Sequence, residues 1–301
     1  GTLPEVSLVG EALHEARIAT IAADIAAQRD RIRVVLIAGP SSSGKTTFSK
    51  RLAIQLLASG LQPFPIALDD YFLERDRTPR DENGEYDYES LGALDVPLFN
   101  QQLIALMAGE PVALPRYNFR TGLREAQSTV TLGAEHVLIV EGIHGLNPDL
   151  VPALPPEAVY RIYISALTQL NLDGINRVAT TDLRVIRRLV RDAATRGYDA
   201  TTTLHRWPSV IAGEKRHIFP YQENGDAIFN SALVHELAML RPMADPLLLQ
   251  VRPDTPEWLE ANRLLSFLQW FKPATVEVVP TNSILREFVG GSVLETFRFA
   301  K

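Results

Sequence analysis

The chain has 301 residues, 46% of them hydrophobic and 22% charged, a composition typical of a folded globular protein. Its formal net charge of −6 argues against non-specific binding to nucleic acid, and the lack of cysteine excludes disulfides, thiolate catalysis and cysteine-ligated zinc. No apolar run approaches the roughly 18 residues of a membrane span, and no signal-peptide pattern opens the chain, so we expect a cytoplasmic protein. The first residue is Gly rather than Met, from which we expect a tag scar or a fragment of a longer protein.

The apolar residues alternate between helical spacing and short continuous runs, which predicts alternating helices and strands. In chain order we expect a helix over residues 8–29, a strand over 34–38, a helix over 46–58, a strand over 64–68, a polar loop or hairpin over 74–92, a helix over 96–108, strands over 130–132, 136–140 and 160–164, helices over 181–196 and 204–215, and a mainly helical segment from about 234. This alternation implies an α/β fold with a mostly parallel sheet and right-handed crossovers.

Residues 39–46 read Gly-Pro-Ser-Ser-Ser-Gly-Lys-Thr and match the phosphate-binding pattern G-x-x-x-x-G-K-[ST] between a strand and a helix. Backbone N–H groups and the helix dipole would converge on phosphate there. Lys45 would reach the β- and γ-phosphates, and the Thr46 hydroxyl would ligate Mg²⁺. A structural glycine turn is the alternative, which the flanking strand and helix disfavour. The predicted ATP-binding residues are Gly39, Pro40, Ser41, Ser42, Ser43, Gly44, Lys45, Thr46 and Thr47.

Acidic residues follow two of the predicted strands. Asp69 and Asp70 come after the strand at 64–68, where the alternative to a catalytic role is turn chemistry. Glu141 ends the apolar run 136–140, in the place of an acid that holds Mg²⁺ directly or through water, although a plain strand-ending acid is the alternative. Ligands of such folds bind beyond the carboxyl ends of the strands, so we expect Lys45, Asp69 and Glu141 to share one cleft.

The predicted helix over 181–196 is rich in arginine. Arg188 and Arg191 lie three residues apart and share a face, alongside Arg184, Arg187 and the nearby Arg196. Such a run is commonly a solvated face. In a phosphoryl-transfer enzyme the same arrangement forms a lid that neutralises the γ-phosphoryl group and excludes water.

These residues together resemble the uridine kinase and phosphoribulokinase family of P-loop kinases. The segments that carry the resemblance are 39–47, 69–72, 88–95, 115–119, 141–143 and 187–197, within about residues 33–230. The resemblance implies a three-layer P-loop NTPase fold with an arginine-rich helical lid over about 181–216. It divides the chain into an N-terminal helix (1–32), a kinase domain (33–232) and a mainly helical C-terminal extension (233–301).

The resemblance also implies roles for individual residues. Asp69 matches the family's catalytic base, with Asp70 as the second choice, and Asp69 joins Thr46 and Glu141 as a candidate metal ligand. Tyr71 corresponds to a substrate-contacting aromatic, Glu89 to the ribose-binding acid and Tyr117 to the base-stacking tyrosine; packing at the edge of the core is the alternative for both tyrosines. The phosphate-facing lid arginines match Arg188, Arg191 and Arg196.

Three positions depart from the family pattern. Gly122 stands where uridine/cytidine kinases carry a histidine that reads the pyrimidine, Tyr198 replaces a second lid arginine, and Arg206 replaces a glutamine that holds the nucleoside. Segments 78–87 and 280–291 are more narrowly similar to a bacterial subgroup whose kinase often follows a region similar to part of threonyl-tRNA synthetase.

Three hypotheses about function follow. The first is an ATP- and Mg²⁺-dependent kinase for the 5′-hydroxyl of uridine or cytidine. The second is a kinase for a non-nucleoside acceptor such as a sugar phosphate, bound by Arg120 and Arg206. The third is a nucleotide-binding regulatory module of a longer protein, which the acidic charge and the set of catalytic residues disfavour. We expect ATP and a small hydroxyl acceptor as partners, no nucleic acid or membrane, and a homo-oligomer if the apolar residues of 264–271 pack on a second subunit rather than on the kinase body.

Overall fold

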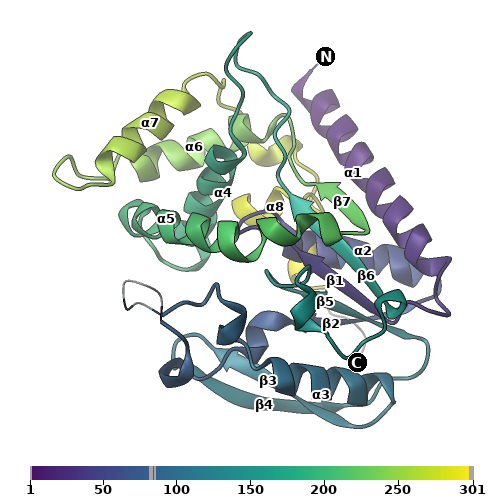
Figure 1. Ribbon diagram of the computed structural model, residues 1–301. Helices are drawn as coiled ribbons and strands as arrows, with labels where there is room; N and C mark the ends of the chain where they lie inside the picture. The colour runs from purple at the N-terminus through teal and green to yellow at the C-terminus, as the bar shows by residue number, and fades with distance from the viewer. Residues whose placement is uncertain (1, 81–83, 85, 298–301) are drawn as a thin grey trace.

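A computed structural model describes residues 2–80, 84 and 86–297. Its centre is a five-stranded parallel sheet with the order β2-β5-β1-β6-β7 (Figure 1). The strands are β1 (Val34–Ala38), β2 (Gln62–Ala67), β5 (His136–Glu141), β6 (Val159–Ser165) and β7 (Ala227–Asn230). The predicted parallel sheet is therefore confirmed, and the segment that leaves β1 emerges from the middle of it.

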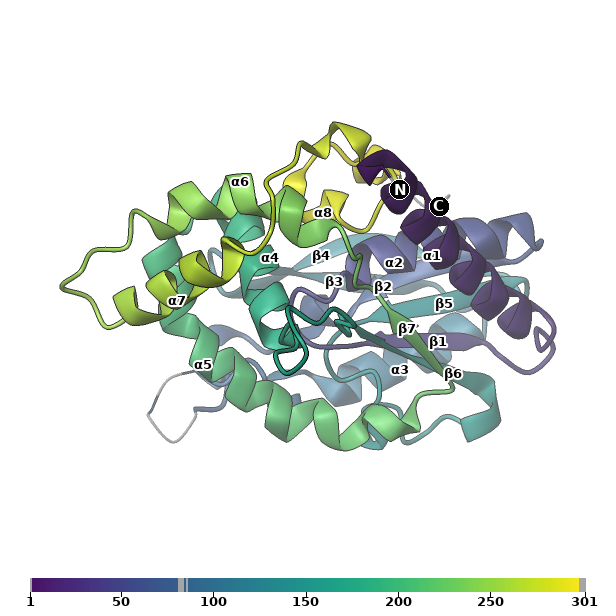
Figure 2. The same cartoon turned by 90° about the horizontal axis from the view of Figure 1, so that it is seen from above.

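Helices cover both faces of the sheet (Figure 2). Successive side chains of β1 point to opposite faces, so that Val35 and Ile37 join one hydrophobic core while Val34 and Leu36 join the other. The first core is covered by α1 (Leu3–Ala26) and α2 (Lys45–Ala58), and the second by α3 (Val96–Met107). This is the three-layer arrangement that the family resemblance implies.

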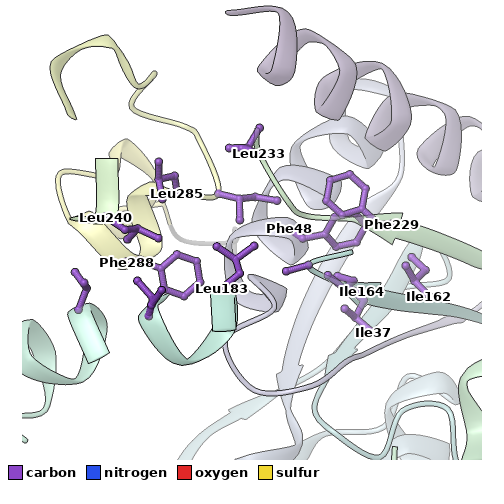
Figure 3. Close-up of a cluster of buried hydrophobic side chains, with 14 of the residues drawn as sticks. Ile37, Phe48, Ile162, Ile164, Leu183, Phe229, Leu233, Leu240, Leu285 and Phe288 are labelled. Carbon is purple, nitrogen blue, oxygen red and sulfur yellow. The ribbon is translucent and has the colours of Figure 1, made fainter. Parts of the chain in front are cut away.

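The remaining helices are α4 (Thr180–Thr195), α5 (Ala200–His217), α6 (Glu236–Leu248), α7 (Trp258–Leu268) and the short α8 (Arg286–Val289). Both α6 and α8 pack against α4. Leu240, Leu285 and Phe288 lie in the same buried cluster as Leu183 of α4 (Figure 3). This cluster is part of the first core, the main core of the protein, so the C-terminal segment shares it. In the described part of the chain, no helix is both long enough and apolar enough to cross a bilayer.

Two helices begin four or five residues earlier than predicted because capping side chains extend them. The first helix begins at Leu3 rather than at 8, since Glu5 accepts the amide of Thr2 at 2.7 Å in the manner of a capping box. The helix expected over 204–215 begins at Ala200, because the Asp199 carboxylate accepts the amide of Thr202 at 2.7 Å.

The strand predicted over 130–132 is mostly wrong, because only Val130 lies in a strand. The preceding residues form an antiparallel hairpin of β3 (Val112–Asn118) and β4 (Leu123–Val130), which the sequence did not predict. The register shifts between Ala113 and Pro115, which interrupts the alternation by which such a strand is recognised. Gly122 turns the chain at a φ of +74°, a conformation that favours glycine.

The short edge strand β7 was also not predicted, because four residues that pair with β6 alone leave little periodic signal. Residues 74–92 are irregular apart from short 3₁₀ turns and a bridge between Arg80 and Tyr86, as expected of a loop or hairpin. Positions 81–83 and 85 of that segment lie outside the described residues.

Candidate active site

The phosphate-binding loop runs from the end of β1 into the first turn of α2, as predicted. A Cβ on Gly39 would lie 1.9 Å from the carbonyl oxygen of Ile164, and Gly44 has a φ of +88°, so both positions require glycine. The ammonium group of Lys45 donates to the carbonyl oxygens of Gly39 at 2.9 Å and Pro40 at 3.2 Å. The loop therefore curls around the lysine that would contact phosphate.

The predicted acids lie at the same edge of the sheet as this loop. The Thr46 hydroxyl donates to Oε1 of Glu141 at 2.8 Å, and Asp69 lies in a 3₁₀ turn that directly follows β2. Burial raises the pKa of Glu141 to about 7 against the opposing charge of Lys45. Burial also raises the pKa of Asp69, again opposed by Lys45. A hydroxyl and carboxylate oxygens are the ligands that Mg²⁺ prefers, so the residues present fit that ion.

Glu89 joins the site from the irregular segment that precedes α3. Burial raises the pKa of Glu89 to about 7, the charge of Glu214 adds to the shift, and Arg188 and Lys45 oppose it. A Cβ on Gly213 would lie 2.6 Å from Cβ of Glu89, so the glycine allows α5 to approach this closely. At neutral pH the Glu89 carboxyl group could both donate and accept hydrogen bonds with a bound hydroxyl.

The arginine-rich helix is not a solvated face. Arg184 is 1% exposed, donates to the carbonyl oxygen of Ser41 at 2.8 Å and pairs with Glu214. Glu214 in turn accepts the amide of Ser41 at 2.8 Å. Arg187 is fully buried, pairs with Glu236 at 2.6 Å and donates to the carbonyl oxygen of Ser42 at 3.2 Å. These two ion pairs therefore bind the backbone of the phosphate loop from behind.

The three predicted lid arginines gather around one buried carboxylate. Arg188, Arg191 and Arg196 lie 3.2, 3.0 and 3.5 Å from the carboxylate oxygens of Asp192. Arg188 also donates to the Ser41 hydroxyl at 2.9 Å, which places its guanidinium beside the phosphate loop. Burial lowers the pKa of Arg188, and the Asp192 charge opposes that shift.

The two predicted substrate tyrosines lie in packed surroundings. Tyr71 is 1% exposed and donates its hydroxyl to Oε1 of Gln102 at 2.9 Å, which favours the packing alternative for this residue. The ring of Tyr117 contacts the rings of Phe72 and Phe119, with centroids 5.6 and 5.1 Å apart. Phe119 is 60% exposed, so this aromatic cluster reaches the surface.

The positions that depart from the family pattern also have clear surroundings. Arg206 is exposed, and its guanidinium lies 4.9 Å from the centre of the Tyr198 ring, so two of the departures contact each other. The Arg75 side chain fills the space beside Gly122, with Nε 2.9 Å from where a Cβ would lie. Arg120 is exposed near the turn of the β3–β4 hairpin.

Sequence reasoning missed three acids that contact the phosphate loop or its arginines: Glu214, Glu236 and Glu287. Glu287 accepts both the amide and the hydroxyl of Thr47, at 3.2 and 3.0 Å. The only sequence signal for it was its place in the segment 280–291, which resembled the bacterial subgroup. For Glu214 and Glu236 we find no local signal, because each pairs with an arginine on a different helix.

The chain is similar to several known kinases. The chain is similar to uridine kinase from Deinococcus deserti, with 30% identity over 175 residues that cover 58% of this chain and 75% of that protein. Uridine kinase from Staphylococcus epidermidis is 28% identical over 196 residues, covering 65% of this chain and 86% of that protein. A solved structure described as a possible uridine kinase from Bacillus stearothermophilus is 23% identical, covers 71% of this chain and 97% of that chain, and has a TM-score of 0.47.

A protein-family model also matches this chain. The model of the phosphoribulokinase/uridine kinase family matches residues 34–238, more than half of the chain. This range contains the phosphate loop, the acids at the strand ends and the arginine-rich helix. The chain therefore belongs to the phosphoribulokinase/uridine kinase family and is a P-loop kinase that transfers a phosphoryl group to an alcohol acceptor.

Proposed function

We propose that this kinase transfers the γ-phosphoryl group of ATP to the 5′-hydroxyl of uridine or cytidine. The observation that carries the proposal is the position of Asp69 in the turn after β2, at the edge of the sheet where Lys45 follows β1 and Glu141 ends β5. A carboxylate beside a phosphate loop is positioned to accept the proton of an attacking hydroxyl. The names of the similar kinases from Deinococcus deserti and Staphylococcus epidermidis support uridine as the acceptor.

The proposed roles of the residues around the phosphate loop follow from their chemistry. The raised pKa of Asp69 makes its carboxylate a stronger proton acceptor than an ordinary aspartate. Lys45 and Arg188, with Arg191 and Arg196 on the same lid, would neutralise charge on the transferring group. Thr46 and Glu141 would hold Mg²⁺, which supplies further charge neutralisation when it is bound.

Glu89 and Tyr117 are the residues that would bind the acceptor. Glu89 lies near enough to Lys45 and Asp69 for their charges to affect its pKa, so a ribose hydroxyl bound to it would lie close to the phosphate loop. Tyr117 is only 4% exposed, so a base would have to reach it through the aromatic cluster that the exposed Phe119 carries to the surface. The second candidate acceptor is a sugar phosphate, because Arg120 and Arg206 are exposed and Gly122 has no side chain to read a pyrimidine.

The test is ATP-dependent release of ADP, measured by a coupled assay with a panel of nucleosides and sugar phosphates. Uridine or cytidine should stimulate release, and Asp69→Asn should lower kcat by about 10²- to 10⁴-fold. Asp70→Asn is the matched control, because an asparagine oxygen can still accept the Tyr117 amide that Asp70 accepts at 3.2 Å. Stimulation by a sugar phosphate alone favours the second acceptor, and tight ATP binding without any phosphorylated product favours a regulatory module.

A further inference from the structure

A carboxylate from the C-terminal segment occupies the start of the helix that follows the phosphate loop. Glu287 of α8 accepts the amide of Thr47 at 3.2 Å and its hydroxyl at 3.0 Å. Thr47 is the third residue of α2, and the first N–H groups of a helix have no acceptor within the helix itself. In a phosphate-binding loop these N–H groups are the donors that an anionic ligand uses. Glu287 therefore holds a donor that a nucleotide phosphate would also use.

The segment 281–291 that carries Glu287 is packed firmly against the loop. Ile284, Leu285 and Phe288 are buried in the main core, as the labelled Leu285 and Phe288 show (Figure 3). A methyl group of Ile284 lies 2.5 Å from the position that a Cβ on Gly44 would take. The guanidinium of Arg187 lies 4.9 Å from the centre of the Phe288 ring. The carboxylate is thus presented by a segment that Ile284, Leu285 and Phe288 hold in the core, and its displacement would disturb the packing of that segment.

The charge of Glu287 also acts on the catalytic groups. Its negative charge raises the pKa of Lys45, against the larger lowering that burial causes. It also raises the pKa of Glu141, in the same direction as burial. Glu287, Asp69, Glu141 and Glu214 all affect the pKa of Lys45. An incoming phosphate must therefore approach against acidic groups, and Glu287 is the one of these that contacts an amide at the start of α2.

We propose that Glu287 competes with nucleotide phosphate for the amide of Thr47, so that ATP binding displaces this carboxylate and loosens the segment 281–291. The inference rests on nucleotide binding at the phosphate loop, which is part of the proposed function, but it does not depend on which acceptor is phosphorylated. It assigns the C-terminal segment a second role, because the segment packs the core and also responds to the occupancy of the site.

Equilibrium binding of a non-hydrolysable ATP analogue with Mg²⁺ tests the competition. In Glu287→Gln the side chain keeps its size and can still accept the Thr47 amide, but it loses its negative charge. We expect this variant to bind the analogue about tenfold more tightly than wild type, the scale of one charged hydrogen bond. Glu277→Gln, the same change at an exposed position, should leave binding unchanged. Equal or weaker binding by Glu287→Gln would overturn the proposal, because the carboxylate would then serve only to hold α2.

Hydrogen exchange on the wild-type protein gives a second readout that needs no variant. Amides of residues 284–289 should exchange faster when the ATP analogue is bound, and unchanged or slower exchange would overturn the proposal. A wild-type protein that does not bind the analogue contradicts both this inference and the proposed kinase site. Tighter binding by Glu287→Gln supports the competition even if uridine and cytidine are not phosphorylated, so the two proposals fail separately.

Discussion

Replacing Glu214 with glutamine should strongly destabilise the protein. The Glu214 and Arg184 side chains are 0% and 1% exposed, and both bind Ser41 in the phosphate loop. Glu214→Gln keeps the size of the side chain but leaves the buried guanidinium without its counter charge. Breaking a buried pair in this way costs about 3–5 kcal/mol. The carbonyl oxygen of Ser41 and the ring of Trp207, 5.3 Å away, still face the guanidinium, so we expect about 3 kcal/mol.

Unfolding by urea measures this change as a difference in the free energy of unfolding between the variant and wild type. Asp254→Asn is the control, because Asp254 and Arg252 form an ion pair with side chains that are 64% and 76% exposed. Such an exposed pair contributes about 0–1 kcal/mol. The double variant Arg184→Met/Glu214→Leu should recover part of the loss, since it removes both buried charges. A loss of under about 1 kcal/mol for Glu214→Gln would refute the view that this pair is a buried structural one.

Three further changes test other parts of the site. The pKa of Glu89 is about 7 in the folded protein against 4.5 for an ordinary glutamate, so the folded state binds this proton more tightly and loses stability as pH rises from about 4.5 to 7. Glu89→Gln should therefore gain about 2.5 kcal/mol relative to wild type between pH 5 and pH 8 in urea unfolding, and a pH-independent difference would contradict this. Glu141→Gln should raise the Mg²⁺ concentration for half-maximal ADP release about tenfold or more. Thr46→Ser keeps the hydroxyl and should leave that concentration unchanged. An equal Mg²⁺ requirement in Glu141→Gln and wild type would argue against this metal site. Gly44→Ala should lower the free energy of unfolding by more than Gly60→Ala. Both glycines have a positive φ, but only at Gly44 would the added Cβ meet a neighbouring side chain, at 2.5 Å. Equal losses of about 1–2 kcal/mol in the two variants would exclude that clash.

The parts of the site that could be predicted from the sequence depend on local patterns. The loop from 39 to 46 was recognisable because its glycines, its lysine and the flanking strand and helix are contiguous. The positions of Asp69 and Glu141 followed from a general rule, since parallel strands end at one edge of a sheet. Both inferences required only the order of elements along the chain, and the observed sheet agrees with them.

The parts that could not be predicted depend on contacts between distant residues. Arg184 and Arg187 are separated by 30 and 49 positions from their partners Glu214 and Glu236. An arginine-rich helix has the same pattern whether it faces solvent or buried acids, so the sequence left both alternatives open. Burial of Tyr71 was open for the same reason, because its partner Gln102 lies 31 positions away.

The shape of the phosphate loop therefore depends on residues far outside the phosphate-binding motif. Glu214 of α5 binds the amide of Ser41, and Glu287 of α8 binds the amide of Thr47. Arg187 of α4, whose charge is paired with Glu236 of α6, binds the carbonyl oxygen of Ser42. The separation of a kinase domain at residue 232 stays a prediction, but a chain cut there would lack Glu236 and Glu287. Arg187 would then carry a buried charge without a partner directly behind the loop, which is costly in a protein interior. The motif alone does not hold this geometry, because buried arginines of α4 and a buried acid of α5 bind its backbone, and an acid of α6 pairs with one of those arginines.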